Sequence, residues 1–251
     1  MSDSTLENKA VPVVSICVLT YNHEKFIRQA LDSFLMQMVD FKVEIIVHDD
    51  ASLDQTQNIL KEYDSNYPGI FNLLLQNENQ RSKFGGGMNP RFNYPRAKGK
   101  YIALCEGDDY WTDPLKLQKQ ISIFKEDSSL SLVFHSVYIK EIMDDLSIKE
   151  IAAENRYYTS DELLLTKVAH TASFLFKISF LNNNLLIHKD VFGGDLVLAL
   201  SMAENGNVYG YKDYMAVYRK HEGGVSVTEI ERLGVNHYKR FVRQFIYFKK
   251  M

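Results

Sequence analysis

The sequence predicts an α/β fold in which helices flank a mostly parallel central sheet. In the first half of the 251-residue chain, short apolar runs rich in β-branched residues alternate with segments whose apolar residues recur at helical spacing. Unbroken apolar runs are typical of strands covered on both faces, and strand–helix alternation favours parallel strands joined by right-handed crossovers. No internal repeat or low-complexity linker divides the chain, so one domain with an irregular C-terminal portion is the simplest interpretation.

The first half contains four expected strands and three expected helices. The strands are VVSICVL (13–19), VEIIVHDD (43–50), FNLLLQ (71–76) and YIALC (101–105). The helices are FIRQALDSFLMQM (26–38), LDQTQNILKEY (53–63) and PLKLQKQISIFKE (114–126). Ser52 and Gln55 form a capping-box pattern before the second helix, and Asp113 with Pro114 supplies an N-cap and an N1 proline for the third.

The second half is less regular. Two strands are expected at SLVFHSVYI (131–139) and TASFLFK (171–177), with a polar, charged connection between them. A helix is expected at GDLVLALSMAENG (194–206), followed by a pair of short strands, NVYGYKD (207–213) and MAVYRKH (215–221). Thr228 and Glu231 form another capping box, which predicts an amphipathic helix over 228–251.

Composition narrows the function classes. A net charge of −3 and a pI of about 6.2 do not indicate a nucleic-acid binder. No apolar run approaches the roughly 20 residues of a membrane span, and the polar N-terminus does not resemble a signal peptide. Cys17 and Cys105 both lie inside apolar runs, which predicts buried thiols in a reducing cytosol.

Polar clusters follow three of the predicted strands. They are TYN (20–22), HDDASLD (48–54) and EGDDYW (106–111). In an open parallel sheet the carboxyl ends of the strands meet at one rim, where ligands bind. The sequence therefore predicts one ligand site built from three segments that are far apart in the chain.

The acids of these clusters have two interpretations. Carboxylates after strands often cap the next helix, but Ser52 and Asp113 fill the capping positions and leave four acids, Asp49, Asp50, Asp108 and Asp109, without a structural role. Adjacent carboxylates repel each other unless a cation neutralises them, and oxygen ligands suit Mg²⁺ or Mn²⁺. Because Mg²⁺ usually shares its shell with substrate phosphates, EGDD predicts a phosphorylated ligand.

Two other nucleotide-binding motifs are absent from the sequence. The first predicted strand is followed by TYNHEKF (20–26) in place of GxGxxG, which argues against a dinucleotide site. FGGGMNPR (84–91) lacks the Lys-Ser/Thr pair of a P-loop, so it is either a flexible surface loop or a substrate-facing one.

Three stretches together resemble the family 2 glycosyltransferases of GT-A fold, which are inverting enzymes that use nucleotide-diphosphate sugars. They are VSICVLTYN (14–22), EIIVHDDASLD (44–54) and AKGKYIALCEGDDYWTDPLKLQKQ (97–120). The resemblance covers about residues 13–125, with weaker matches in GGDLVLAL (193–200) and YRKHEGGVS (218–226). Order, spacing and flanking residues all match the family pattern.

The resemblance implies a donor site made by four residues: Thr20, Tyr21, Asp50 and Asp108. Thr20 and Tyr21 would line the nucleoside pocket, and Asp50 would accept a hydrogen bond from the base ring. EGDD stands where the family has its DxD signature. Asp108 would approach the ribose or phosphate, and Asp109 would bind the Mn²⁺ or Mg²⁺ that bridges the diphosphate. Glu106 replaces the first Asp of the signature, which leaves its contact with the ligand open.

The same pattern implies a base and a further residue at the metal. Asp195 matches the acid that serves as general base, although an acid at a helix N-terminus is also favoured by the macrodipole. His221 falls where relatives place a residue against the diphosphate, although a lone His is often an ordinary loop residue. Inverting transfer needs a base for the acceptor hydroxyl and a Lewis acid for the departing diphosphate.

The implied enzyme is a metal-dependent, inverting glycosyltransferase of the hexosyltransferase type. It would transfer a sugar from a nucleotide-diphosphate sugar, with UDP the expected nucleotide, to a saccharide or lipid-linked acceptor in surface polysaccharide synthesis. One GT-A domain is expected over 13–227 after a flexible 1–12, with a nucleotide-binding half (13–125) and an acceptor half (126–227). The alternatives are a non-catalytic nucleotide-sugar-binding module and a sugar-phosphate nucleotidyltransferase.

The terminal segment 228–251 mixes cations with aromatic residues. It is either a helix packed on the domain with its cations in water or an interfacial helix touching an anionic membrane. The expected location is accordingly the cytoplasm, with contact at the inner face of the membrane as the second alternative.

Overall fold

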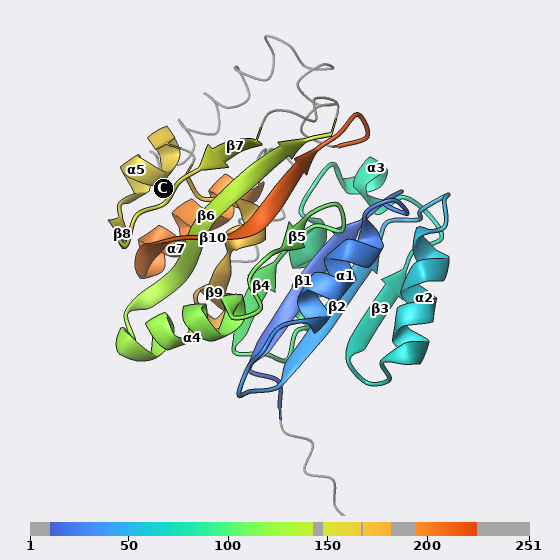
Figure 1. Cartoon of the computed structure of the whole chain (residues 1–251), viewed down its shortest axis with the longest axis horizontal. Coiled ribbons are helices and arrows are strands. Elements are labelled where there is room, and N and C mark those ends of the chain that lie inside the picture. Colours follow the sequence, from blue (N-terminus) through green and yellow to red (C-terminus); the bar gives the residue numbers. More distant parts are fainter. Residues whose placement is uncertain (1–10, 143–147, 167, 182–193, 225–251) are drawn as a thin grey trace, which may run out of the picture.

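A ten-stranded sheet with helices on both faces forms the described part of the chain (Figure 1). The computed structural model describes residues 11–142, 148–166, 168–181 and 194–224. The predicted terminal segments 1–12 and 228–251 therefore lie wholly or mostly outside the described residues. Within the described ranges, no helix is both long and apolar enough to cross a bilayer.

The first half is a parallel sheet, as the sequence predicts. Its strands are β1 (Val14–Thr20), β2 (Val43–Asp49), β3 (Phe71–Leu75) and β4 (Tyr101–Leu104), arranged in the order β3-β2-β1-β4. Thr20 pairs with Asp49, and Cys17 pairs with Leu104. This register brings the carboxyl ends of β1, β2 and β4 to one rim.

The predicted helices of this half lie close to their expected positions but begin differently. They are α1 (Ile27–Leu35), α2 (Thr56–Asn66) and α4 (Lys116–Glu126), and the short α3 (Gln80–Phe84) was not predicted. The predicted capping box before α2 is wrong, because Gln55 makes no side-chain cap and the Ser52 hydroxyl donates to Asp49. Asp113 accepts from the Leu115 amide (2.8 Å), so α4 begins after this turn rather than at Pro114.

The second half extends the sheet with mixed pairing. β9 (Leu175–Lys177) runs antiparallel between β4 and β6 (Leu130–Glu141), and β10 (Asn207–Lys220) runs parallel to β6. β5 (Tyr110–Trp111) closes the edge beside β10, which gives the order β3-β2-β1-β4-β9-β6-β10-β5. The predicted pair of short strands at 207–221 is wrong: bulges near Tyr211 and Tyr214 let one long strand follow β6 throughout.

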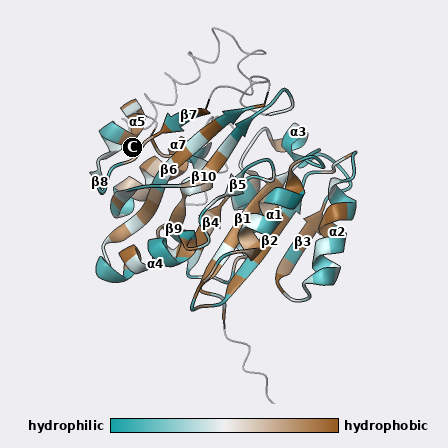
Figure 2. Cartoon of the chain, viewed as in Figure 1, coloured by the Kyte–Doolittle hydropathy of each residue, from teal (hydrophilic) through white to brown (hydrophobic). Residues whose placement is uncertain are grey.

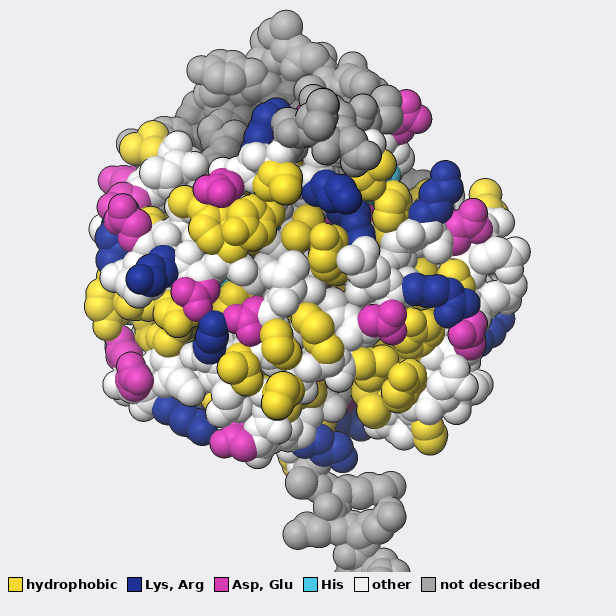
Figure 3. Space-filling view, in the orientation of Figure 1, with side chains coloured by type: hydrophobic (Ala, Val, Ile, Leu, Met, Phe, Trp, Pro, Cys, Tyr) yellow, Lys and Arg dark blue, Asp and Glu magenta, His cyan; other side chains and the backbone are white. Residues whose placement is uncertain are grey.

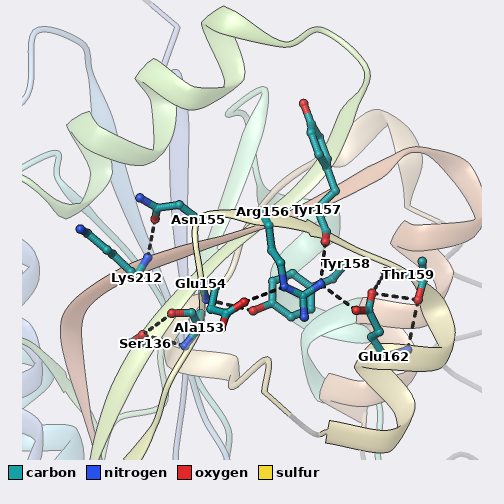
Figure 4. Close-up of polar contacts among 10 residues, drawn as sticks. All are labelled: Ser136, Ala153, Glu154, Asn155, Arg156, Tyr157, Tyr158, Thr159, Glu162 and Lys212. Atoms are coloured by element: carbon teal, nitrogen blue, oxygen red, sulfur yellow. Dashed lines mark hydrogen bonds and ion pairs between the residues drawn. The ribbon is translucent and has the colours of Figure 1, made fainter.

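The polar connection between β6 and β9 contains elements that the sequence analysis did not predict. They are β7 (Ile148–Ile151), β8 (Arg156–Tyr158) and α5 (Ser160–Thr166). Arg156 pairs with Glu154 (2.9 Å) and Glu162 (2.7 Å), and the Tyr158 hydroxyl accepts from the Glu154 amide (2.9 Å) (Figure 4). The charges of this segment are therefore used to fix its own turns.

Two hydrophobic cores cover the two faces of the sheet. Helices α1, α2 and α4 cover one face, and α5 with α7 (Gly194–Asn205) covers the other. Hydrophobic residues dominate along the central strands, whereas much of α4 is hydrophilic (Figure 2). Cys17 and Cys105 are buried and free, as predicted. On the face with α1 and α4, positive and negative side chains are interspersed (Figure 3).

Lys116, at the start of α4, is fully buried. Its ammonium donates to the Gln120 side chain (2.8 Å) and lies 4.0 Å from the centroid of the Trp111 ring. Burial lowers the pKa of Lys116 to about 7. The ammonium therefore loses its hydration near the middle of the domain, with one hydrogen bond and one ring face as compensation.

Replacing Lys116 by methionine is expected to change stability in a pH-dependent way. Between about pH 7 and 10.5 the folded parent binds fewer protons than its unfolded chain, so the parent gains stability as pH rises. Methionine does not titrate. The free energy of unfolding of Lys116→Met relative to the parent is therefore highest below pH 7 and falls by about 5 kcal/mol across this window, since each pH unit between the two pKa values is worth about 1.4 kcal/mol. Urea unfolding of both proteins below and within the window measures this, and a constant difference would contradict it.

Candidate active site

The three predicted polar clusters meet at one rim of the sheet. The Asp50 amide donates to the Thr20 carbonyl (3.0 Å), and the Gly107 amide donates to the Leu19 carbonyl (2.8 Å). The segments that follow β1, β2 and β4 are thus joined by main-chain hydrogen bonds. The predicted convergence is confirmed.

Thr20 and Tyr21 lie at the end of β1. The Thr20 side chain is buried, and its hydroxyl has no hydrogen-bond partner in the described structure. Tyr21 is 41% exposed. A buried hydroxyl without a partner is uncommon in native proteins, because it loses the hydrogen bonds that water supplied. At this rim it is a ready contact for a polar ligand.

Gly107 allows the EGDD segment to lie directly against β1. A Cβ at this position would be 2.8 Å from both Cβ and Oγ1 of Thr20, and 2.9 Å from Cδ1 of Ile27. Both neighbours are buried, so neither can move aside easily. The glycine inside the acidic motif is therefore required by close packing of the rim.

Replacing Gly107 by alanine is expected to lower the free energy of unfolding by about 1–3 kcal/mol, since an added methyl group overpacks a tight contact. Gly194→Ala is the matched control, because a Cβ there meets no atom of the described residues within 4 Å. Urea unfolding of the two variants measures the difference. Equal stabilities would show that the rim yields to the added methyl.

Two of the four acids have local structural roles that the sequence analysis did not anticipate. Asp49 accepts from the Ser52 amide (3.0 Å) and from the Gln57 side chain (2.6 Å). Asp50 accepts from the amides of Gln80 (2.6 Å) and Arg81 (3.0 Å) at the start of α3. The expectation that these acids lack a structural role is wrong for both.

Asp109 also faces the protein interior. It is 2% exposed, and its Oδ1 accepts from the Arg219 amide (2.9 Å) in β10. Burial, together with the charges of Asp108 and Glu106, raises the pKa of Asp109 well above its usual value. Asp109 ties the motif to β10, and the structure does not place it among the candidate metal ligands.

Asp108 instead lies between two histidines. Its Oδ2 is 3.0 Å from Nε2 of His221 and 3.6 Å from Nε2 of His23. In the described part of the chain these three residues are the one group of His, Cys, Asp or Glu whose ligand atoms all lie within 4.8 Å of one another. His23 follows β1 and His221 follows β10, so the cluster joins both halves of the sheet.

The electrostatics of this cluster suit a divalent metal ion. Burial opposes ionisation of Asp108, but the His221 hydrogen bond and the charges of both histidines outweigh it and lower the pKa of Asp108. Burial lowers the pKa of His23, which favours the neutral imidazole that a metal requires. Nδ1 of His23 is buried and has no partner in the described structure. One carboxylate and two imidazoles therefore fit a first-row transition ion.

Sequence reasoning identified Asp108 and His221 but missed His23. His23 is part of TYNHEKF, directly after the first predicted strand, and that position at the rim was the available signal. It was not used because His23 is far from the acidic motif in the sequence.

Asp195 lies at the beginning of α7 and is partly buried. Its Oδ1 accepts from the amide of Leu196 (2.8 Å). Burial, the charge of Asp108 and the charge of Asp195 together raise the pKa of Glu106 to about 8, and Asp195 also acts on His170. Asp195 therefore lies within electrostatic reach of the EGDD motif. Its assignment as base stays a prediction.

Comparison with known proteins identifies relatives over most of the chain. The family model for glycosyl transferase family 2 matches residues 15–180. An uncharacterised protein of Mycobacterium tuberculosis is 35% identical over 214 residues, which cover 84% of this chain and 60% of that protein. Chondroitin synthase of Escherichia coli is 31% identical over 126 residues, 50% of this chain and 17% of the synthase. The chain spans about 60% of the length of the first of these relatives.

Two solved structures are similar in fold. Staphylococcus aureus TarS 1–349 in complex with UDP-GlcNAc has a TM-score of 0.66 at 21% identity, over 84% of this chain and 59% of that chain. The mannosyltransferase PcManGT from Pyrobaculum calidifontis, in complex with GDP-Man and Mn²⁺, has a TM-score of 0.65 at 20% identity, over 94% and 65%. The mixed sheet, its rim and the match over residues 15–180 agree: the chain belongs to glycosyltransferase family 2 and has the GT-A fold.

Proposed function

We propose that this chain transfers a sugar from a nucleotide-diphosphate sugar to an acceptor hydroxyl, with inversion, at the rim formed by β1, β2 and β4. The observation that carries the proposal is the cluster of His23, Asp108 and His221, together with the Thr20 hydroxyl, which has no hydrogen-bond partner among the described residues. Both solved neighbours described above hold nucleotide-diphosphate sugars. Family membership favours transfer over the nucleotidyltransferase alternative.

The metal assignment changes from Asp109 to Asp108. Asp108, His23 and His221 would hold the ion, while Asp109 secures the loop through Arg219. Two imidazoles favour Mn²⁺ over Mg²⁺, which prefers oxygen ligands. The bound ion would act as a Lewis acid toward the departing diphosphate.

The nucleoside is proposed to lie against Thr20, Tyr21 and Asp50, with UDP as the expected nucleotide. Both oxygens of Asp50 already accept from main-chain amides of α3. Each carboxylate oxygen retains a second lone pair, so Asp50 can still accept from a base ring. In this arrangement α3 orients Asp50 before the donor arrives.

Asp195 is proposed to accept the proton of the acceptor hydroxyl. Burial, with the charges of Asp108 and Asp195, raises the pKa of Glu106 to about 8, so Glu106 is mostly protonated at neutral pH and able to donate a hydrogen bond. Because Glu106 then holds its own proton, Asp195 is the carboxylate left to accept the proton of the acceptor hydroxyl. The acceptor is proposed to be a saccharide or lipid-linked saccharide of surface polysaccharide synthesis.

A donor screen tests the proposed function. The full chain is incubated with UDP- and GDP-sugars and Mn²⁺, and release of UDP or GDP is measured with and without saccharide acceptors. We expect nucleotide release that depends on Mn²⁺. Binding of Mn²⁺ with UDP or GDP in calorimetry, but no release from any donor, would identify a binding module instead.

Membrane contact through 228–251 also stays a prediction, because that segment lies outside the described residues. Co-sedimentation with anionic liposomes compares the full chain with a version that ends before Thr228. Equal pelleting of both would contradict a membrane role for the segment.

A further inference from the structure

His170 is held at the edge of the site by a short 3₁₀ turn, Thr171–Ser173. Nδ1 of His170 accepts from the amide of Ala172 (3.3 Å), which caps this turn. The carbonyl of His170 accepts from both the amide (2.9 Å) and the hydroxyl (2.6 Å) of Ser173. Main chain and ring are thus fixed together.

The EGDDYW segment and α4 anchor this turn from beneath. The Trp111 indole donates to the Ala172 carbonyl (2.9 Å), and the Gln120 side chain donates to the Ser173 carbonyl (2.8 Å). Gln120 is in turn held by buried Lys116. The position of the His170 ring is therefore coupled to the acidic motif that carries Asp108.

The cap determines which ring nitrogen carries the proton. A main-chain N–H can only donate, so Nδ1 of His170 must be the acceptor nitrogen and a neutral imidazole then holds its proton on Nε2. Burial lowers the pKa of His170 to about 4, although the charges of Asp195 and Asp108 oppose this shift. His170 is consequently a neutral donor at physiological pH.

The Nε2–H group of His170 is not used by the described residues. With the described residues, Nε2 forms no hydrogen bond, and the ring is only partly buried. One side of the ring packs on Tyr218, at 4.4 Å between centroids. Asp195, Asp108 and Lys220 all lie within electrostatic reach of it. The ring therefore packs on β10, the strand that ends directly before the proposed metal ligand His221, and the turn that carries it is tied to Trp111 of the acidic motif.

We propose that His170 is a sugar-binding residue whose Nε2–H donates to a hydroxyl of the transferred sugar. This inference rests on the proposed function, in which the sugar must lie near both Asp195 and the ion held by Asp108. A fixed N–H donor at that place would hydrogen-bond a sugar oxygen but would not contact the nucleotide. His170 would therefore help to select and orient the transferred sugar.

Two substitutions separate this role from capping. His170→Asn keeps an acceptor near the Nδ1 position for the Ala172 amide and removes the distal donor. His170→Gln reaches the Nε2 position with an amide N–H and loses the cap. Calorimetry on the full chain with Mn²⁺ measures the Kd of UDP and UDP-GlcNAc, and of GDP and GDP-mannose. The pair that the parent binds is used for the variants.

Each variant should change one of two measured quantities, the Kd ratio or the melting temperature, and leave the other at its parental value. In His170→Asn the ratio of the Kd of the nucleotide sugar to that of the nucleotide should rise about 5- to 10-fold, with a parental melting temperature. In His170→Gln the ratio should stay parental while the melting temperature falls. A parental ratio in His170→Asn, or an equal rise in both variants, overturns the inference while the proposed function stands. A parent that binds neither nucleotide overturns both.

Discussion

Replacing Asp108 by asparagine is expected to abolish Mn²⁺-dependent nucleotide binding and to lower turnover by about 10³-fold or more. Asp108 is the carboxylate between His23 and His221, and an amide is a far weaker ligand for a divalent ion. Lewis-acid stabilisation is worth several kcal/mol, and about 1.4 kcal/mol corresponds to tenfold in rate. Calorimetry with Mn²⁺ and the nucleotide, paired with single-turnover transfer, measures both losses.

The neighbouring acid provides a matched control. In Asp109→Asn the amide oxygen can still accept from the Arg219 main chain, so the loop stays attached to β10. We expect Asp109→Asn to bind Mn²⁺ and nucleotide within about twofold of the parent, because a change of a few tenths of a kcal/mol is no more than that. The opposite pattern, loss in Asp109→Asn and retention in Asp108→Asn, would restore Asp109 as the metal ligand.

Replacing Asp195 by asparagine is expected to leave nucleotide binding intact and to slow the transfer step strongly. The proposed role of Asp195 is to take the proton of the acceptor hydroxyl, which an amide cannot do. General base catalysis is typically worth about 10²–10⁴-fold, and turnover should fall by that factor. Single-turnover transfer with saturating donor isolates this step, because donor binding then no longer limits the rate.

Asp161→Asn is the control for a purely structural role of Asp195. Both acids lie in the first turn of a helix, Asp161 in α5 and Asp195 in α7, where the macrodipole favours negative charge by about 0.3–1 kcal/mol. Both variants should therefore lose a similar small amount of stability, but only Asp195→Asn should lose turnover. Near-parental transfer by Asp195→Asn would assign the base to another residue.

The first half of the fold was predictable because its signals are local. Runs such as VVSICVL and VEIIVHDD are apolar and β-branched over one strand length, and the observed strands differ from the predicted ones by one or two residues. The rim followed from topology, since parallel strands must end together. Local pattern and sheet geometry were sufficient here.

The details of the site were not predictable because they depend on distant partners. The roles of Asp108 and Asp109 differ although the residues are adjacent: one side chain meets His221, 113 positions away, and the other meets the Arg219 amide, 110 positions away. Asp50 has a cap to fill only because α3 begins beside it. No spacing rule within the acidic motif contains this information.

The prediction of secondary structure was wrong where strand pairing outweighed the local sequence preference. Residues 207–221 were expected to form two short strands, 207–213 and 215–221. β6 offers an uninterrupted partner, and bulges absorb the extra residues so that β10 stays paired along its length. Pairing with β6 is therefore the reason that this segment forms one strand and not two.

The long separation between Asp108 and His221 also bears on how the domain assembles. A bound ion that joins them closes a loop of more than one hundred residues, which constrains the unfolded chain far more than a local contact does. Such an ion stabilises only the fully folded domain, so its concentration shifts the folding equilibrium by mass action. During synthesis the last ligand emerges after β10, and a growing chain cannot gain this stabilisation until nearly the whole sheet has left the ribosome.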